Sequence, residues 1–419
     1  MHLTIVGAGW AGLSAAVHAV QRGWAVTLWE ASRQLGGRAR TLAHHPLQLD
    51  NGQHILIGAY TDTLALMRTL GIRPDHVLHR QPLTLVRPDG SGLTLPDLPP
   101  PWNLLFGVLR AVGWRWQDRW SLLRTASRWQ RQQFACEAHV TVAELCADLS
   151  PRVMEQLIEP LCVSALNTPS HSASAAVWLR VLQDALWSGA GGSDLLLPTC
   201  DLGALMPDAA VQWLQQRGVE LHLGSRWVPS SPTSEALVLA CPPWEAARLT
   251  SDAFPAWSTQ AQALQHAAIT TVYVQHPDPD FNGLPLPMMA LPSDAGRPAQ
   301  FVFDRGQLLG PSQRGVLACV VSHSESTRQA LELQVLAQLQ EQLPVTAGPL
   351  RIVQTVVEKR ATFVCCPGLQ RPPATIGPGW WACGDYVAGP YPATLEGAVR
   401  SGREVIDQIA QTCEREGRR

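Results

Sequence analysis

The chain has 419 residues, which is enough for more than one domain with a sizeable core. Its formal net charge is −2, and charged residues make up 16% of it, against about 25% in an average soluble protein. These values exclude the basic surface that nucleic-acid binding requires, so no nucleic-acid partner is expected. No apolar run reaches the length of about 18 residues that a membrane-spanning helix needs.

The cysteine and histidine spacings indicate neither a disulfide framework nor a metal site. The ten cysteines contain no Cys-x-x-Cys pair, and the thirteen histidines contain no His-Glu-x-x-His motif. No signal peptide is expected either, because the first predicted strand begins at residue 3. We therefore expect reduced thiols, no bound metal and a cytoplasmic protein.

The first elements follow the order of a dinucleotide-binding unit. A short apolar strand over residues 3–6 leads directly into the glycine-rich turn Gly7–Gly12. A helix is predicted over 13–22 and a second strand over 25–29, and Glu30 stands at the end of that strand. Strand, glycine-rich turn, helix, strand and acid in this order predict a βαβ unit that binds a dinucleotide, rather than a glycine-rich turn without a ligand.

Each residue of this unit has a physical task. Gly7 permits the tight turn, Gly9 lets the backbone approach a pyrophosphate, and Gly12 allows the helix to pack closely. The helix N-terminus, which contains Ala11, presents free N–H groups and a positive dipole end to the phosphates. The Glu30 carboxylate can accept hydrogen bonds from both ribose hydroxyls.

A second glycine pair indicates which dinucleotide is bound. Gly36, Gly37 and Arg38 lie within ten residues of Glu30. An NAD site needs no second glycine pair at this place. A longer dinucleotide that carries a flavin does, because the chain must wrap around its far side. FAD is therefore the predicted cofactor.

The segment Trp102–Trp129 combines aromatic and basic residues. It contains five of the sixteen tryptophans and five arginines, with Asp118 as its only acid. Helices of this composition suit a membrane surface. The alternative is a helical cap over a substrate cavity with its arginines in water. Its tryptophans are Trp102, Trp114, Trp116, Trp120 and Trp129.

Later segments predict a return to the dinucleotide domain. A helix is predicted over 205–217, followed by strands over 219–228 and 237–241. Near the C-terminus, Gly384 permits close backbone approach, and Asp385 can bind a ribityl hydroxyl or a phosphate-bound water. A helix that starts at Glu396–Ala398 can direct its positive end at the flavin ring; Thr394 and Leu395 come just before it.

These motifs resemble the FAD-dependent amine oxidase and carotenoid desaturase superfamily. Asp50–His54 and Glu358–Phe363 narrow the resemblance to the hydroxysqualene dehydroxylase family, also called squalene-associated FAD-dependent desaturases. The resemblance implies an α/β fold. In it, a Rossmann-like FAD-binding domain of the glutathione-reductase type is interleaved with a mixed α+β substrate domain. The predicted segments are 1–75, 201–245 and 351–419 for the FAD domain, and 76–200 and 246–350 for the substrate domain.

The resemblance also implies the residues of the site. Asp50–His54 is expected against the flavin, with His54 either donating a proton to a leaving hydroxyl or only packing locally. Val228 is expected to contact the adenine through its backbone. The predicted cofactor-binding residues are Gly7, Gly9, Ala11, Gly12, Glu30, Ala31, Gly36, Gly37, Arg38, Gly52, Gln53, His54, Val228, Gly384, Asp385, Thr394, Leu395, Glu396 and Ala398.

The implied activity is reduction of hydroxysqualene to squalene in squalene and hopanoid biosynthesis. The partners are then a long isoprenoid, an electron donor that the sequence does not identify, and a membrane surface, with the protein peripheral to the cytoplasmic membrane. Three alternatives remain: a carotene-type isoprenoid desaturase, a flavin amine oxidase, and a prenyl-binding escort without a redox role. Thr394 counts against the amine oxidase, because relatives of that kind place an aromatic ring there. Tyr386 and Tyr391 lie close enough in sequence to replace it in part.

Overall fold

Two sheets organise the molecule. The computed structural model describes residues 1–44, 47–229, 235–278, 280–343 and 349–416. The first sheet has six strands, and its inner strands run parallel. In spatial order they are β10 (Glu220–Leu223), β2 (Ala25–Glu30), β1 (His2–Val6), β11 (Ala236–Leu239), β18 (Trp380–Ala382) and β17 (Thr375–Gly377).

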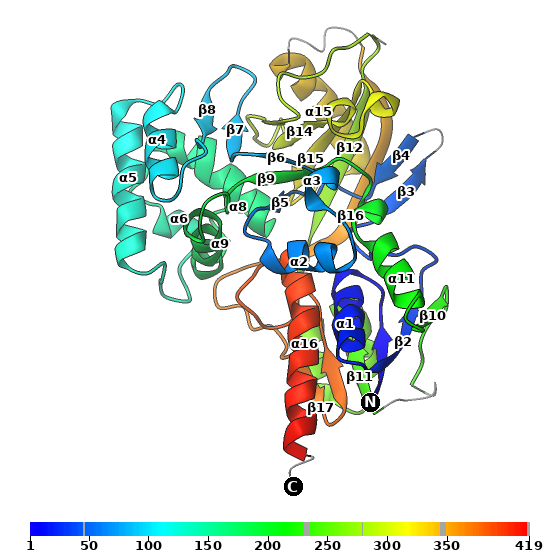
Figure 1. Ribbon diagram of the computed structural model, residues 1–419. Helices are drawn as coiled ribbons and strands as arrows, with labels where there is room; N and C mark the ends of the chain where they lie inside the picture. Colours follow the sequence, from blue (N-terminus) through cyan, green and yellow to red (C-terminus); the bar gives the residue numbers. More distant parts are fainter. Residues whose placement is uncertain (45–46, 230–234, 279, 344–348, 417–419) are drawn as a thin grey trace.

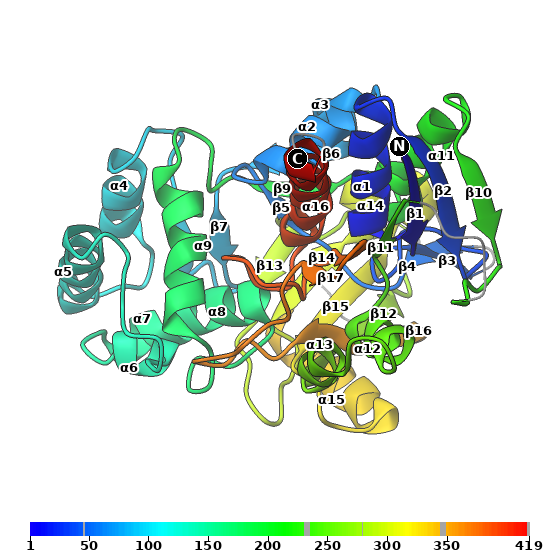
Figure 2. The ribbon, with the colours of Figure 1, turned by 90° about the horizontal axis from the view of Figure 1, so that it is seen from below.

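The centre of this sheet is buried on both faces. Residues 3–6 of β1 are all buried, as expected for a continuous apolar run in a parallel sheet. On one face α1 (Trp10–Gln21) lies between α16 (Leu395–Glu416) and α11 (Pro207–Gln215) (Figure 2). The loops that leave the carboxyl ends of β1, β2 and β11 therefore meet at one edge of the sheet.

The second sheet is antiparallel and has one face toward a helix and the other toward the site. Val272 and Val274 of its longest inner strand, β12 (His266–Gln275), pack with α15 (Arg328–Gln342), whereas Ile269 and Tyr273 point to the opposite face. Its five strands, in spatial order, are β13 (Met288–Ala290), β14 (Phe301–Asp304), β15 (Val316–Ser322), β12 and β16 (Arg351–Phe363).

A helical region lies to one side of this sheet, at the left of Figure 1. It consists of α4 (Trp102–Arg110), α5 (Trp116–Arg131), α6 (Val142–Leu145), α7 (Pro151–Val153), a π-helical turn (Met154–Ile158), α8 (Glu159–Leu166) and α9 (Ala175–Trp187). Three small sheets complete the fold: β3 (Thr41–His44) with β4 (Leu47–Asp50), β7 (Thr84–Val86) with β8 (Gly92–Thr94), and β5 (Leu56–Ile57) with β9 (Leu195–Pro198) and β6 (Leu78–Gln81). The remaining helices are α2 (Thr61–Thr69), α3 (Pro74–Val77), α10 (Leu202–Leu205), α12 (Pro243–Thr250), α13 (Pro255–Gln262), α14 (Arg305–Leu309) and a 3-10 turn (Pro311–Gln313).

The predicted fold class is confirmed: a Rossmann-like α/β domain is interleaved with a mixed α+β domain. Strands from 1–75, 201–245 and 351–419 all enter the six-stranded sheet. The domain boundaries stay a proposal, and β16 bears on one of them. Because β16 pairs along β12, a division that follows the sheets lies after residue 363 rather than at 351.

Two local predictions were too long. The helix predicted over 205–217 is interrupted at Met206, and a new helix starts at Pro207, since proline favours the first position of a helix. The strand predicted over 219–228 pairs only over Glu220–Leu223. The two helices and the strand still place this segment beside α1 and β2, as expected.

The α1–α16 contact has no room for a side chain at Gly402. A Cβ atom there would lie 2.3 Å from the carbonyl oxygen of Ala11 and 2.9 Å from Cβ of Ser14. The close crossing holds the N-terminal turn of α1 against α16.

Replacing Gly402 with alanine should therefore destabilise the protein by about 1–3 kcal/mol, because the two helices must separate. Urea unfolding of the flavin-loaded protein measures this. The control is Gly296→Ala, where the nearest atom to an added Cβ is 3.5 Å away, and where a change within about 0.5 kcal/mol is expected. Equal stabilities of the two variants would contradict the close crossing.

Candidate active site

One cavity of about 650 Å³ lies where the two sheets meet. This volume is within the roughly 300–1,000 Å³ typical of cofactor and ligand sites. Most residues predicted to bind the cofactor line it: Gly7, Gly9, Ala11, Glu30, Ala31, Gly36, Gly37, Arg38, Gly52, Gln53, His54, Gly384, Asp385, Thr394, Leu395 and Ala398. Gly12, Val228 and Glu396 do not line it. The role of each residue in cofactor binding stays a prediction.

The glycine-rich turn presents an open helix end to the cavity. Gly7 has φ +113°, and a Cβ atom at Gly12 would lie 1.9 Å from the carbonyl oxygen of Gly7. Gly12 thus acts through packing beneath the turn. No side chain caps α1 at Gly9, and its first turn contains no acid. Its N–H groups are therefore free for an anion such as a pyrophosphate.

Glu30 braces the loops at the end of β2. Its carboxylate accepts hydrogen bonds from the backbone N–H groups of Ala8 at 2.7 Å and Ser32 at 2.8 Å. Near this end of the cavity, the indole Nε1 of Trp227 is buried and has no partner among the described residues. Val228, the residue predicted from the sequence, is 44% exposed and lies just outside the lining.

An ion pair closes the middle of the cavity wall. Arg38 pairs with Asp385 and donates a second hydrogen bond to the carbonyl oxygen of Ala361 at 2.8 Å. Burial lowers the pKa of Arg38, but the charge of Asp385, its hydrogen bond to Arg38 and the charge of Glu358 together outweigh this effect, and the net shift is upward. Arg38 therefore remains a cation at the place where a dinucleotide carries its phosphates.

Contacts with residues outside the cavity lining anchor the Asp50–His54 segment. Asp50 does not line the cavity; it forms a buried ion pair with Arg305 at 3.3 Å. The Tyr273 hydroxyl donates to the carbonyl oxygen of Asp50 at 2.8 Å and accepts from Nε2 of Gln53 at 3.1 Å. These contacts fix Gly52 and Gln53 at the cavity wall.

His54 is neutral at neutral pH. Burial, together with the charge of Arg38, lowers its pKa to about 4, against the ordinary value of 6.5. A neutral imidazole can donate or accept one hydrogen bond but is a weak proton donor. The predicted role of His54 as a general acid stays a prediction, and this pKa disfavours it.

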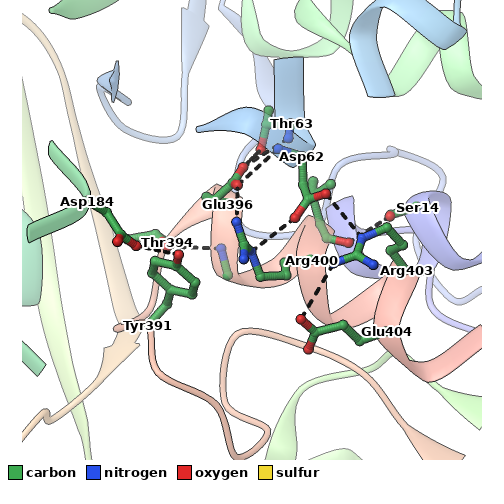
Figure 3. A network of polar contacts seen from close by, with 12 residues as sticks. Ser14, Asp62, Thr63, Asp184, Tyr391, Thr394, Glu396, Arg400, Arg403 and Glu404 are labelled. Carbon is green, nitrogen blue, oxygen red and sulfur yellow. Dashed lines mark hydrogen bonds and ion pairs between the residues drawn. The ribbon is translucent and has the colours of Figure 1, made fainter. Parts of the chain in front are cut away.

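Figure 3 shows why Glu396 lies outside the cavity lining. Its carboxylate accepts from the backbone N–H groups of Asp62 at 3.0 Å and Thr63 at 2.9 Å, and it therefore caps α2. Arg400 joins Glu396 to the side chain of Asp62, at 3.2 and 3.0 Å. Thr394 caps α16 instead, since its hydroxyl accepts from the N–H of Gly397 at 3.0 Å. The network fixes α2 against the start of α16.

Three tyrosines lie near Thr394, but only two reach the cavity. Tyr386 lines it and is 2% exposed, with no partner for its hydroxyl among the described residues. Tyr391, which the sequence offered as a second ring, instead donates to Asp184 and packs under Arg400 (Figure 3). Tyr60, which the sequence analysis missed, lines the cavity at the start of α2.

The half of the cavity beside the second sheet is mostly apolar, with Ser322, Glu358 and Thr362 as the polar residues that this sheet contributes. Ile269, Phe301, Phe303 and Val320 come from three adjacent strands, and Val163 and Ala165 come from α8. The cavity thus joins a polar half, rich in glycine and charged groups, to a hydrocarbon-lined half. Among the described residues, no cluster of histidine, cysteine and carboxylate side chains is placed to hold a metal ion.

Comparison with known proteins identifies the family. The model of the family described as "Flavin containing amine oxidoreductase" matches residues 10–410. The chain belongs to this family. It is 27% identical to the hydroxysqualene dehydroxylase of Rhodopseudomonas palustris, with 97% of each chain covered. It is 24% identical to that of Zymomonas mobilis, with 96% of this chain and 97% of the relative covered.

Solved structures agree with the fold. An oxidoreductase from Methanosarcina mazei superposes with a TM-score of 0.71 at 14% identity, over 97% of this chain and 100% of the other. Cyclohexylamine oxidase from Brevibacterium oxydans superposes with a TM-score of 0.69 at 17% identity, over 99% of both chains.

The chain is thus an FAD-dependent oxidoreductase, and the prediction of FAD is confirmed. The site fits that cofactor: the uncapped N-terminus of α1 and the Arg38 cation border a cavity of about 650 Å³, and Trp227 and Tyr386, which also line it, have polar atoms without a partner among the described residues.

The lowered pKa of His54 predicts a pH-dependent stability. As the pH falls from about 6.5 to about 4, the unfolded chain protonates this histidine while the folded protein does not, so folding stability is lost. Between about pH 7 and about pH 4.5, the free energy of unfolding of His54→Gln should therefore fall by about 1–2 kcal/mol less than that of the wild type. Urea unfolding at the two pH values measures this. His79→Gln, at an exposed position, serves as the control and should follow the wild type. A parallel loss in all three proteins would show that His54 titrates normally.

Proposed function

We propose that this oxidoreductase reduces hydroxysqualene to squalene and releases the hydroxyl group as water, in squalene and hopanoid biosynthesis. The observation that carries the proposal is the single cavity, in which an FAD-type polar half opens directly into a half lined by hydrocarbon side chains. Two full-length relatives named hydroxysqualene dehydroxylase support the same substrate class.

The residues of the chain perform three tasks in this reaction. Ile269, Phe301, Phe303 and Val320 hold the isoprenoid and exclude water from the reacting carbon. The N-terminus of α1 and Arg38 hold the cofactor at a fixed position relative to that carbon. Bound in its reduced form, FAD supplies the hydride. The leaving hydroxyl needs a proton, because water is a far better leaving group than hydroxide.

The alternatives differ in what they require of the cavity. A carotene-type desaturase would use the same apolar half with the opposite electron flow. An amine oxidase needs rings around a cation, and Thr394 stands where relatives of that kind carry one; Tyr60, which forms a hydrogen bond with Thr394, and Tyr386 line the same cavity. An escort without redox chemistry does not agree with the FAD oxidoreductase family of the chain.

The direction of electron flow separates the two isoprenoid activities. Enzyme whose flavin has been reduced is mixed anaerobically with hydroxysqualene. The flavin spectrum should become oxidised and squalene should form in equal amount, as measured by absorbance and product mass. The control is the same mixture with squalene alone, which should leave the flavin reduced. A flavin that stays reduced with the alcohol, while oxidised enzyme dehydrogenates a saturated isoprenoid, would favour the desaturase.

A second proposal concerns the membrane surface. Five apolar side chains on α4, α5 and their connection are exposed by 38–60%: Trp102, Phe106, Val112, Trp116 and Trp120. Arg110, Arg115 and Arg124 are exposed beside them, while Asp118 is buried as the N-terminal cap of α5. An aromatic surface with exposed arginines, and with no exposed acid on α4 or α5 themselves, fits an anionic bilayer.

Two tryptophans of the segment do not belong to this surface. Trp114 is 5% exposed and donates to Gln156 at 2.8 Å, and Trp129 is 3% exposed and packs edge-on against Trp178. These two side chains pack into the core of the substrate domain, and no residue of 102–129 lines the cavity over which a cap was the alternative. None of the described helices is long and apolar enough to cross a membrane. We propose a peripheral position on the cytoplasmic membrane, from which a bilayer-soluble substrate enters.

Replacing Trp102, Trp116 and Trp120 together with serine should lower partitioning onto vesicles of anionic phospholipid by tenfold or more, because three interfacial anchors of about 1 kcal/mol or more each are lost. Co-sedimentation measures the partitioning. Leu333→Ser is the control, since Leu333 is 71% exposed on the distant helix α15. Unchanged partitioning of the folded triple variant would contradict the membrane surface.

A further inference from the structure

The cavity-facing side of the second sheet forms an apolar floor, and a carboxyl group lies at one end of it. On adjacent strands Ile269 pairs with Ser322 on one side and with Glu358 on the other. Residues directly opposite in antiparallel strands have side chains on the same face. All three line the cavity, so they form one row across β15, β12 and β16.

The next row of the same face is apolar. Phe301 pairs with Val320, and Val320 pairs with Thr271, two residues along β12 from Ile269. Phe301 and Val320 line the cavity with Ile269. The hydrocarbon floor therefore runs across β14, β15 and β12 and ends at Glu358 on the edge strand β16.

Glu358 also lies next to the polar half of the cavity. Its charge acts on Arg38, to which Asp385 contributes more strongly. Ala361, three residues further along β16, accepts a hydrogen bond from the same arginine. Glu358 thus stands where the substrate half meets the cofactor half.

The other carboxylates that line the cavity are already engaged. Glu30 accepts from two backbone N–H groups, Asp385 pairs with Arg38, and Glu245 pairs with Arg226 and Arg248, both at 2.8 Å. Glu358 makes no hydrogen bond or ion pair with any residue that the structure describes. It is the lining carboxyl that is free to contact a ligand.

We propose that Glu358 is the proton donor to the hydroxyl group that leaves the isoprenoid alcohol, an assignment that rests on the proposed function. The O–H bond of the Glu358 carboxyl breaks and its proton bonds to the alcohol oxygen. The C–O bond then breaks with its electron pair on that oxygen, and water leaves. Reduced FAD provides the hydride that completes the new C–H bond. Glu358 is left as a carboxylate and regains a proton from solvent.

Substrate binding changes the surroundings of Glu358. A hydrocarbon that fills the floor removes water from the carboxyl, and removal of water favours the uncharged form. Arg38 interacts electrostatically with Glu358, and its positive charge favours the carboxylate. Asp385 and His54 line the same cavity, His266 lies on the adjacent strand β12, and Lys359 and Arg360 follow Glu358 in β16. Burial lowers the pKa of His54 to about 4, which disfavours His54 as the proton donor at neutral pH.

The experiment compares Glu358→Gln, Glu358→Asp and His54→Gln in single turnovers of the reduced enzyme with hydroxysqualene. Glutamine preserves shape and hydrogen bonding but carries no acidic proton. In the wild type, the rate of squalene formation should fall as the pH rises. Glu358→Gln should form squalene about 10²–10⁴-fold more slowly, and its rate should not depend on pH in this way, whereas Glu358→Asp should keep the pH dependence. The control is Glu414→Gln, at an exposed position of α16, which should behave as the wild type.

Binding is measured separately from turnover. Flavin absorbance of the oxidised variants, titrated with the alcohol, should give dissociation constants for the alcohol within about twofold of the wild type, as expected for a group that acts only in the transition state. Three outcomes would overturn the assignment. Glu358→Gln could form squalene at the rate of the wild type, or its affinity for the alcohol could fall by the same factor as its rate. The pH dependence of the rate could also disappear in His54→Gln and persist in Glu358→Gln. If the wild type binds the alcohol but forms no squalene, the proposed function fails and the assignment fails with it.

Discussion

The arrangement of the site depends on the ion pair between Arg38 and Asp385. Arg38 follows the second strand of the six-stranded sheet, Asp385 follows β18, and Ala361, which accepts from the same guanidinium, lies in the strand at the edge of the other sheet. One arginine therefore ties three distant segments to the wall of one cavity. Breaking such a pair costs more than the pair itself contributes, because the remaining charge stays buried without a partner.

Local motifs were predictable because their geometry is fixed within a few residues. The turn from Gly7 to Gly12 and the acid Glu30 occupy their expected places, since strand, turn and helix leave one arrangement for them. Side-chain direction was not predictable in the same way. Glu396 sits in the expected helix, yet its carboxylate turns to the first turn of α2, and that neighbour comes from far away in the sequence.

The residues that line the apolar half of the cavity could not be predicted from the sequence. Ile269, Phe301 and Val320 belong to strands whose composition matches that of any buried sheet, and half of each strand faces the helix α15 instead. Only the pairing register decides which residues share a face. Glu358 illustrates the point: the motif that contains it supported the resemblance, but its place at the end of the floor follows from its pairing with Ile269.

The interleaved chain order has a consequence for biosynthesis. β1 pairs with β2, which follows it closely in the sequence, but its other neighbour β11 comes from the middle of the chain, and β18, which pairs with β11, comes more than 100 residues later still. Until they arrive, β1 has an open apolar edge that can pair with other chains, and sheets with such distant partners fold slowly. Pairing of β1 with β11 therefore requires closure of a long loop, and the exposed edge of β1 can aggregate before that pairing forms. The FAD site shares this dependence, because its lining combines Gly7 and Glu30 with Asp385, which lies more than 350 residues further along the chain.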